Sequence, residues 1–263
     1  MKRCLIIIFV SLFLMVQGCE KPADRNDKVI ENARTNFISG FYVDSEKGFE
    51  RYLQDNPQGE FRLEAWNYLV KIAYEVRHDS ERGSSILEAM YLEFGHNSEL
   101  AASLKRQLAE MYILNGHYKT AVEALEKSLE FPDQPQEQLD STREMLAETF
   151  RKLRNYDLAI YTYNDIAEST KNSRTRAKAL FEMAHTLTLI QAWERAESEL
   201  GKLIKMDEVP KDIHSEAVFM LADIYEHNHE YQNAAELLEK IVDTYPNPYA
   251  VRFKLDYLKN KKD

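Results

Sequence analysis

Two groups of side chains in this sequence have the residue types and spacing that chemistry would need. His227 and His229 lie two residues apart within Glu226–Glu230, and a pair of imidazoles can bind zinc. Glu144 and Glu148 lie one helical turn apart, as a general acid and a general base would on one helix face. The histidines lack an HExxH-type spacing, and carboxylates are common on exposed helix faces. We therefore interpret both groups as solvated surface and predict no catalytic residue, no metal site and no cofactor.

The rest of the sequence also lacks the pattern of an enzyme. It contains no GxSxG elbow and no glycine-rich loop that would hold a phosphate. The two cysteines, Cys4 and Cys19, both precede the predicted folded domain, which leaves that domain without a nucleophilic thiol or a disulfide. We predict that the protein is not an enzyme.

The N-terminus has the pattern of an export signal. Lys2 and Arg3 precede an apolar run over 5–16, shorter than the roughly 20 residues that span a bilayer as a helix. The run ends in Val16-Gln17-Gly18-Cys19, which resembles the lipobox of bacterial lipoproteins. The resemblance implies that 1–18 is a signal peptide and that Cys19 is lipidated, for example with palmitate. More than one acyl chain on Cys19 would make the membrane anchor stable.

Composition restricts the partners of the chain that remains. Loss of 1–18 removes Lys2 and Arg3 but no acid, so 32 basic side chains face 44 acidic ones and the net charge is −12. Such a charge repels phosphate backbones, which excludes nucleic acid as a favoured partner. It also argues against a polybasic contact with a membrane surface. The predicted membrane contact is therefore the lipid on Cys19 alone.

Apolar residues from Lys28 onward recur at three- and four-residue spacing, which predicts helices throughout. A column of alanines repeats at intervals of 36 to 40 residues, with a small residue twelve positions after each alanine. An aromatic residue lies three positions before that small residue in five of six repeats, Arg82 being the exception, and a large apolar residue usually lies four positions after it. The alanines are Ala33, Ala73, Ala109, Ala147, Ala184 and Ala222; the small residues are Ser45, Ser85, Ala121, Ala159, Ala196 and Ala234.

These columns predict pairs of antiparallel helices whose backbones approach closely at two small residues. Because no pair buries its apolar face alone, the pairs must stack. The pattern resembles the tetratricopeptide repeat, whose period is about 34 residues. The residues that carry the resemblance are Leu108, Ala109, Tyr112, Gly116, Tyr118, Ala121 and Leu125, and in a later repeat Leu221, Ala222, Tyr225, Tyr231, Ala234, Leu238 and Pro246. The alternative is another helical solenoid or an α-helical bundle.

The predicted fold is an all-α, right-handed α-solenoid of about six tetratricopeptide-like helix pairs with a C-terminal capping helix. The predicted parts are a signal peptide at 1–18, a lipidated cysteine and polar tether at 19–27, a repeat domain at 28–247 and a capping helix at 248–263. We expect Val251, Leu255 and Leu258 to cover the last repeat, with Arg252, Lys254 and Lys259 pointing outward.

In the tetratricopeptide family, the first helix of each repeat lines the concave face. By position, the resemblance implies a partner-binding groove formed by Arg106, Glu110, Glu144, Glu148, Arg151, Phe181, His185, Phe219, Asp223 and Glu226. Phe181 and Phe219 are candidate anchors for a peptide or a partner helix, or alternatively are buried between repeats. Acidic members outnumber basic ones, which favours a neutral or basic ligand.

The function predicted from these features is a lipid-anchored adaptor that binds envelope proteins or peptides. The first repeat also resembles the outer-membrane β-barrel assembly lipoprotein family through Ala33, Phe37, Gly40, Tyr42, Phe49 and Pro57. That resemblance makes outer-membrane protein assembly one candidate pathway. Glu20 in place of Asp after the lipidated cysteine favours the periplasmic face of the outer membrane. The alternative function is a periplasmic component that binds peptides or glycan and peptidoglycan fragments.

Overall fold

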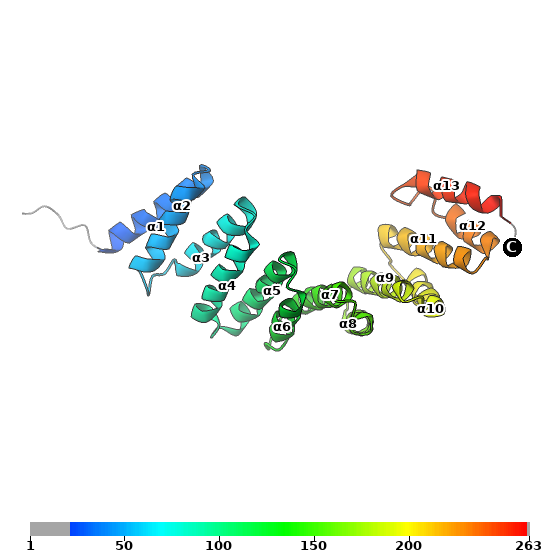
Figure 1. Cartoon of the computed structure of the whole chain (residues 1–263), viewed down its shortest axis with the longest axis horizontal. Helices are drawn as coiled ribbons and strands as arrows, with labels where there is room; N and C mark the ends of the chain where they lie inside the picture. Colours follow the sequence, from blue (N-terminus) through cyan, green and yellow to red (C-terminus); the bar gives the residue numbers. More distant parts are fainter. Residues whose placement is uncertain (1–21, 262–263) are drawn as a thin grey trace, which may run out of the picture. The chain divides into compact units, whose positions relative to one another are not determined.

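The computed structural model describes residues 22–261, and within that range all regular structure is helical. These residues belong to two compact units that divide at Met90. The first unit contains three helices and the first part of a fourth (Figure 1). Its elements are α1 (Pro22–Ile38), α2 (Tyr42–Asp55), α3 (Arg62–Lys71), which continues into a π-helix η1 (Ile72–Val76), and α4 (Ser80–Phe94).

The second unit contains four further helix pairs and a last single helix. Within each pair the two helices pack on each other, and the second helix also packs on the first helix of the next pair. The pairs are α5 (Ser98–Leu114) with α6 (Tyr118–Leu129), α7 (Gln136–Lys152) with α8 (Tyr156–Ser169), α9 (Ser173–Leu189) with α10 (Trp193–Ile204), and α11 (Lys211–His227) with α12 (Tyr231–Glu239); α13 is Pro248–Lys259. Among residues 22–261 the predicted all-helical solenoid of six pairs and a capping helix is confirmed.

Local signals begin and end these helices as the sequence dictates. The side chains of Asn97, Asn172 and Asn247 accept a backbone N–H at the starts of α5, α9 and α13. Each first helix ends at a residue with positive φ that lets the chain turn back. These turn residues recur every 37 or 38 positions: Gly40, His78, Gly116, Arg154, Gln191 and His229.

The alanine column forms the close helix crossings that the sequence predicts. All six alanines have at most 1% of their surface exposed, and five of the six predicted small partners are fully buried. In the first pair the Ser45 hydroxyl donates to the Ala33 carbonyl at 2.9 Å, and a Cβ on Gly48 would lie 2.8 Å from the Ala33 Cβ. The backbones therefore approach too closely there for a larger side chain.

The second pair departs from the predicted register. Ser85 is exposed, and the buried residues of α4 include Gly83 and Leu87, two positions earlier than the predicted Ser85 and Ala89. The first helix of this pair ends in a π-helical turn, where the Arg77 N–H donates to the Ile72 carbonyl at 3.1 Å. The turn residue follows Ala73 by five positions, whereas it follows the alanine of every other pair by seven.

Arg82, the exception in the aromatic column, has an electrostatic role in the first unit. Its guanidinium lies 2.6 Å from a carboxylate oxygen of the buried Glu46 and 3.0 Å from one of Glu50. Arg77 pairs with the second Glu46 oxygen. Two cations thus neutralise an acid that burial would otherwise destabilise.

The terminal helix α13 covers the last pair, with one correction to the prediction. Val251, Leu255 and Leu258 are buried against the core that contains Val218 and Leu238. Lys254 does not point outward, because only 19% of its side chain is exposed and it forms ion pairs with α11. The outward face of α13 carries three exposed aromatic residues, Tyr249, Phe253 and Tyr257, besides Arg252 and Lys259.

The predicted signal peptide and Cys19 lie outside the described residues. The helix α1 begins at Pro22, earlier than Lys28, at which we placed the start of the repeat domain. The assignment of 19–27 to a tether stays a prediction. None of the helices between residues 22 and 261 is both long and apolar enough to cross a membrane.

Candidate functional site

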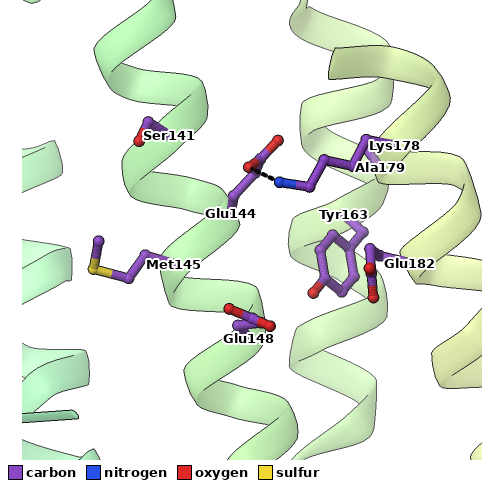
Figure 2. A pocket seen from close by; sticks show the side chains of 8 residues that line it. All are labelled: Ser141, Glu144, Met145, Glu148, Tyr163, Lys178, Ala179 and Glu182. Carbon is purple, nitrogen blue, oxygen red and sulfur yellow. Dashed lines mark hydrogen bonds and ion pairs between the residues drawn. The ribbon is translucent and has the colours of Figure 1, made fainter. Parts of the chain in front are cut away.

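The ten predicted groove residues all lie on first helices of the second unit, but their surroundings differ from helix to helix. Glu144 and Glu148 line a pocket of about 230 Å³ between α7 and α9 (Figure 2). Figure 2 shows Glu144 of α7 reaching across this space to Lys178 of α9, with Tyr163 of α8 beside Glu182. The pocket is lined by Ser141, Glu144, Met145, Glu148, Tyr163, Lys178, Ala179 and Glu182, and we call it the α7–α9 pocket.

Ion pairs join the two helices on either side of this pocket. The Lys178 ammonium donates to a Glu144 carboxylate oxygen at 2.7 Å. One turn further along α9, the Glu182 carboxylate accepts from Arg151 at 2.7 Å. These two ion pairs connect α7 and α9 on either side of the pocket.

Arg151 is the centre of a small network that contains three predicted groove residues. Its guanidinium also lies 3.3 Å from a Glu148 oxygen and 3.3 Å from His185 Nδ1. Interaction with His185, and then the charge of Arg151, hold the pKa of the Glu182 carboxyl below its ordinary value although burial opposes this. Arg151 and His185 therefore position Glu182 at the edge of the pocket.

Tyr163 completes the pocket, and sequence analysis did not select it. Only 2% of its surface is exposed, yet its ring stands between Glu148 and Glu182 and lines the pocket (Figure 2). Burial raises the pKa of its phenol, and the carboxylates of Glu182 and Glu148 add to that effect against the opposing charge of Arg151. Its hydroxyl forms no hydrogen bond among residues 22–261 and is not fully buried.

A signal for Tyr163 was present in the repeat columns. Tyr163 lies four residues after Ala159, where the other repeats of the second unit have Leu125, Leu200 and Leu238. A leucine in that column fills the core without a polar atom. A tyrosine there brings a hydroxyl that needs a partner at the end of its ring, which indicates an adjoining polar space.

The α11 part of the predicted groove is partly covered by the chain itself, although 48% of the Asp223 side chain stays exposed. The Phe219 ring stacks on Tyr245 with centroids 4.7 Å apart, and the Lys254 ammonium lies 5.4 Å from the Phe219 centroid. Lys254 also pairs with Asp223 and, at 2.6 Å, with Glu226. Burial lowers the pKa of Lys254, but its hydrogen bonds to these two carboxylates outweigh that effect and raise it. All three predicted residues on α11 thus have intramolecular partners.

The remaining predicted residues on α5 and α9 lie outside the α7–α9 pocket and have other surroundings. Phe181 is partly buried and packs against the main core of the second unit, so it lies between repeats rather than free in the groove. On α5, burial raises the pKa of the Glu110 carboxyl while the nearby Arg106 lowers it. Arg106 and Glu110 are each partly exposed and lie beside each other without lining the α7–α9 pocket.

The histidine pair at the last turn has local structural contacts. The His227 ring lies against Trp193 with centroids 4.2 Å apart, and His229 Nδ1 lies 2.8 Å from the Tyr231 hydroxyl. Within the described part of the chain, no group of three or more His, Cys, Asp or Glu residues could hold a metal ion.

The helix pairs place the protein in the class of α-solenoids, and comparison with known proteins identifies the repeat. Two family models, both described as tetratricopeptide repeat, match residues 107–134 and 216–248. Both describe a repeat rather than a catalytic domain. The chain is 28% identical over 102 residues to "Tetratricopeptide repeat protein 21A" of Mus musculus. That match covers 39% of this chain and only 7% of the mouse protein.

Solved structures show the same fold at low sequence identity. YrrB, described as a TPR protein with an unusual peptide-binding site, superposes with a TM-score of 0.54 at 19% identity, covering 78% of this chain and 96% of YrrB. The apo form of RapI gives a TM-score of 0.66 at 12% identity and covers 96% of this chain and 74% of RapI. Residues 107–134 and 216–248 therefore match the tetratricopeptide repeat, and the chain has the fold of tetratricopeptide-repeat proteins.

Proposed function

We propose that this protein is a scaffold that binds a segment of a partner protein in the groove between α7 and α9. The observation that carries the proposal is the contrast between two parts of one groove. The α11 part is filled by Tyr245 and Lys254 of the same chain, whereas the α7–α9 pocket keeps an open space lined by charged side chains. A site that the chain does not fill is the part of the groove available to a partner.

The kind of ligand follows from the dimensions and lining of that space. A second cavity of about 380 Å³ adjoins the pocket and shares Ser141 and Glu144 with it. The two together run along the side of α7 towards its first turn, which suits a chain segment better than a compact small molecule. The peptide-binding site in the description of YrrB is that protein's own, and it supports the same use of this fold here.

The groove proposal is tested by capture of partners with a charge-reversed pocket. Glu148→Lys changes a side chain that is 62% exposed, so the fold should survive. Phe181→Glu and Phe219→Glu are unsuitable because both rings pack against cores. We expect chemical cross-linking in cells to yield a defined set of proteins with the wild type and with Glu123→Lys on the exposed side of α6, but not with Glu148→Lys. Equal capture by all three would contradict the proposal.

We further propose that the scaffold works in the bacterial cell envelope, anchored through lipid on Cys19. The support is the export signal over 1–18 and the Val16-Gln17-Gly18-Cys19 junction. Fractionation of a Cys19→Ala variant tests this, since loss of the lipid should release the protein from membranes. Unchanged membrane association would refute the anchor. β-Barrel assembly proteins among the captured set would support a role in outer-membrane protein assembly.

A further inference from the structure

We propose that the α7–α9 pocket takes a single cationic side chain, lysine or arginine, of the bound segment. The inference rests on the proposed function and names the chemistry that the pocket recognises. It is argued from the charges around the pocket and from the Tyr163 hydroxyl that faces it.

The pocket has more negative than positive charge. Three carboxylates line it, those of Glu144, Glu148 and Glu182, and two cations neutralise them. Lys178 pairs with Glu144 at 2.7 Å and Arg151 pairs with Glu182 at 2.7 Å. Glu148 shares Arg151 at the longer distance of 3.3 Å and has 62% of its side chain exposed. One carboxylate thus has no strong counter-ion of its own, and a cation from a ligand would neutralise it.

Tyr163 provides an independent observation that points to a ligand. Only 2% of the residue's surface is exposed, it lines the pocket, and its hydroxyl forms no hydrogen bond among residues 22–261. Figure 2 shows this hydroxyl directed into the space beside Glu148. A guanidinium or ammonium in the pocket would donate to the Tyr163 oxygen and to Glu148 together. The site therefore has both the charge and an unused acceptor for a cationic donor.

The size of the pocket limits the ligand to one side chain. Its volume of about 230 Å³ lies below the range of roughly 300–1,000 Å³ typical of sites for drug-sized molecules. Met145 and Ala179 form its apolar lining and suit the methylene stem of lysine or arginine. The charged end of such a side chain would reach the carboxylates, and the stem would lie against the thioether.

The experiment uses the purified full chain with labelled methionine methyl groups. Met145 lines the pocket, so its methyl resonance reports occupancy. The probe is N-acetyl-arginine-N-methylamide, and the matched neutral probe is the citrulline analogue. We expect a saturable shift of the Met145 resonance with the arginine probe. The citrulline analogue should bind at least about tenfold more weakly, because a charged hydrogen bond is lost. Equal shifts with both probes would overturn the inference.

Two variants locate the effect within the pocket. Glu148→Gln and Tyr163→Phe should each weaken binding of the arginine probe about threefold to tenfold. Tyr161→Phe is the control, because this tyrosine lies on the same helix α8 but is 71% exposed. Unchanged affinity in both pocket variants, with folding verified by circular dichroism, would overturn the assignment.

A third probe distinguishes a free polyamine from a protein side chain as the source of the cation. Spermidine represents free polyamines, and the blocked arginine represents a residue within a chain. Tighter binding of the blocked arginine than of spermidine supports a protein side chain as the ligand. Binding of spermidine about tenfold tighter than that of the blocked arginine would overturn the assignment to a protein side chain. The two proposals can fail separately. If partner capture depends on Glu148 but the arginine probe binds no better than citrulline, this inference is refuted and the scaffold proposal stands.

Discussion

Two stretches of the same groove, α7–α9 and α11–α13, show how one repeat pattern can give an open site or a closed one. Lys178 and Lys254 lie two repeats apart in the same column. Lys178 pairs with Glu144 at the rim and leaves a pocket beside it, whereas Lys254 bridges Asp223 and Glu226 and lies over Phe219. The difference comes from the surroundings of the lysine, because Tyr245 stacks on Phe219 beside Lys254 and no such ring is among the residues that line the α7–α9 pocket at Lys178.

The position of a residue on a first helix therefore does not decide whether it can bind a partner. Glu148 and Asp223 occupy equivalent places in their repeats, yet Asp223 has a lysine of the terminal helix as its partner and Glu148 has only a shared arginine. The availability of a groove residue depends on what the next repeat offers it.

The largest effect is expected from removal of packing under the cap. Leu258→Ala deletes a side chain that is 2% exposed in the core between α12 and α13. We expect a loss of about 2–4 kcal/mol in the free energy of unfolding of this end, measured by denaturant titration. Hydrogen exchange should accelerate in α11–α13 and stay unchanged in α7, since repeats contact only their neighbours. Equal acceleration in both stretches would mean that they do not behave as separate regions.

A smaller loss is expected at the open stretch when its central cation is removed. Arg151→Met keeps much of the side-chain stem but leaves Glu182, which is 24% exposed, without its guanidinium partner. We expect a loss of about 1–2 kcal/mol in the free energy of unfolding. Glu148→Gln, the matched change at an exposed acid, should cost less than about 0.5 kcal/mol. Similar losses in the two variants would contradict the central role of Arg151.

Lys254→Met should convert the closed stretch towards an open one. It frees Asp223 and Glu226 while retaining a side chain that packs against α11. We expect a cost of about 1 kcal/mol by thermal unfolding and a second, weaker site for the arginine probe. Resonances of residues on α11 would report that site by NMR. No change on α11 at saturating probe would show that the lysine is not what closes this stretch.

The smallest effect is a pH dependence at Glu182. Its pKa in the folded protein lies below the ordinary value, so the ionised carboxylate stabilises the native state at neutral pH. That contribution disappears as the pH falls through the ordinary glutamate value of about 4.3 and on through the lowered one. Glu182→Gln should therefore be less stable than the wild type at pH 7, by less than about 1 kcal/mol, and the two should converge in acid. Chemical denaturation at several pH values measures the difference in free energy of unfolding between the two proteins. A difference that grows as the pH falls would contradict a lowered pKa of Glu182.

The solenoid was predictable because its columns depend on residue size alone. Alanines such as Ala109 and Ala147 must be small for the helices to cross, and that requirement is visible in spacing. The register of the second pair was not predictable, because the π-helical turn after Lys71 changes the residue count without changing the composition. The cover over Phe219 was missed for a similar reason: Tyr245 and Lys254 reach it from a later loop and helix that the repeat pattern does not describe.

The candidate site was only partly predictable. Glu144 and Glu148 were found by their position on the first helix, and the structure places both in the pocket. Lys178 and Glu182 were not selected, because they lie on α9 outside the positions carried over by resemblance. Tyr163 was assigned to packing because it occupies a core column, and its ring does pack there. Only the geometry shows that its hydroxyl also faces a space.

Photo-cross-linking from the two stretches in living cells tests most directly whether a partner binds at α7–α9 and not at α11–α13. A photoreactive amino acid is placed at Ser141, which is exposed and lines the α7–α9 pocket, and in a second protein at Asp223 on α11. We expect discrete adducts with other proteins from position 141 and none, or far fewer, from position 223. Adducts from position 223 alone, or equally from both, would contradict an open site at α7–α9 beside a closed one at α11–α13.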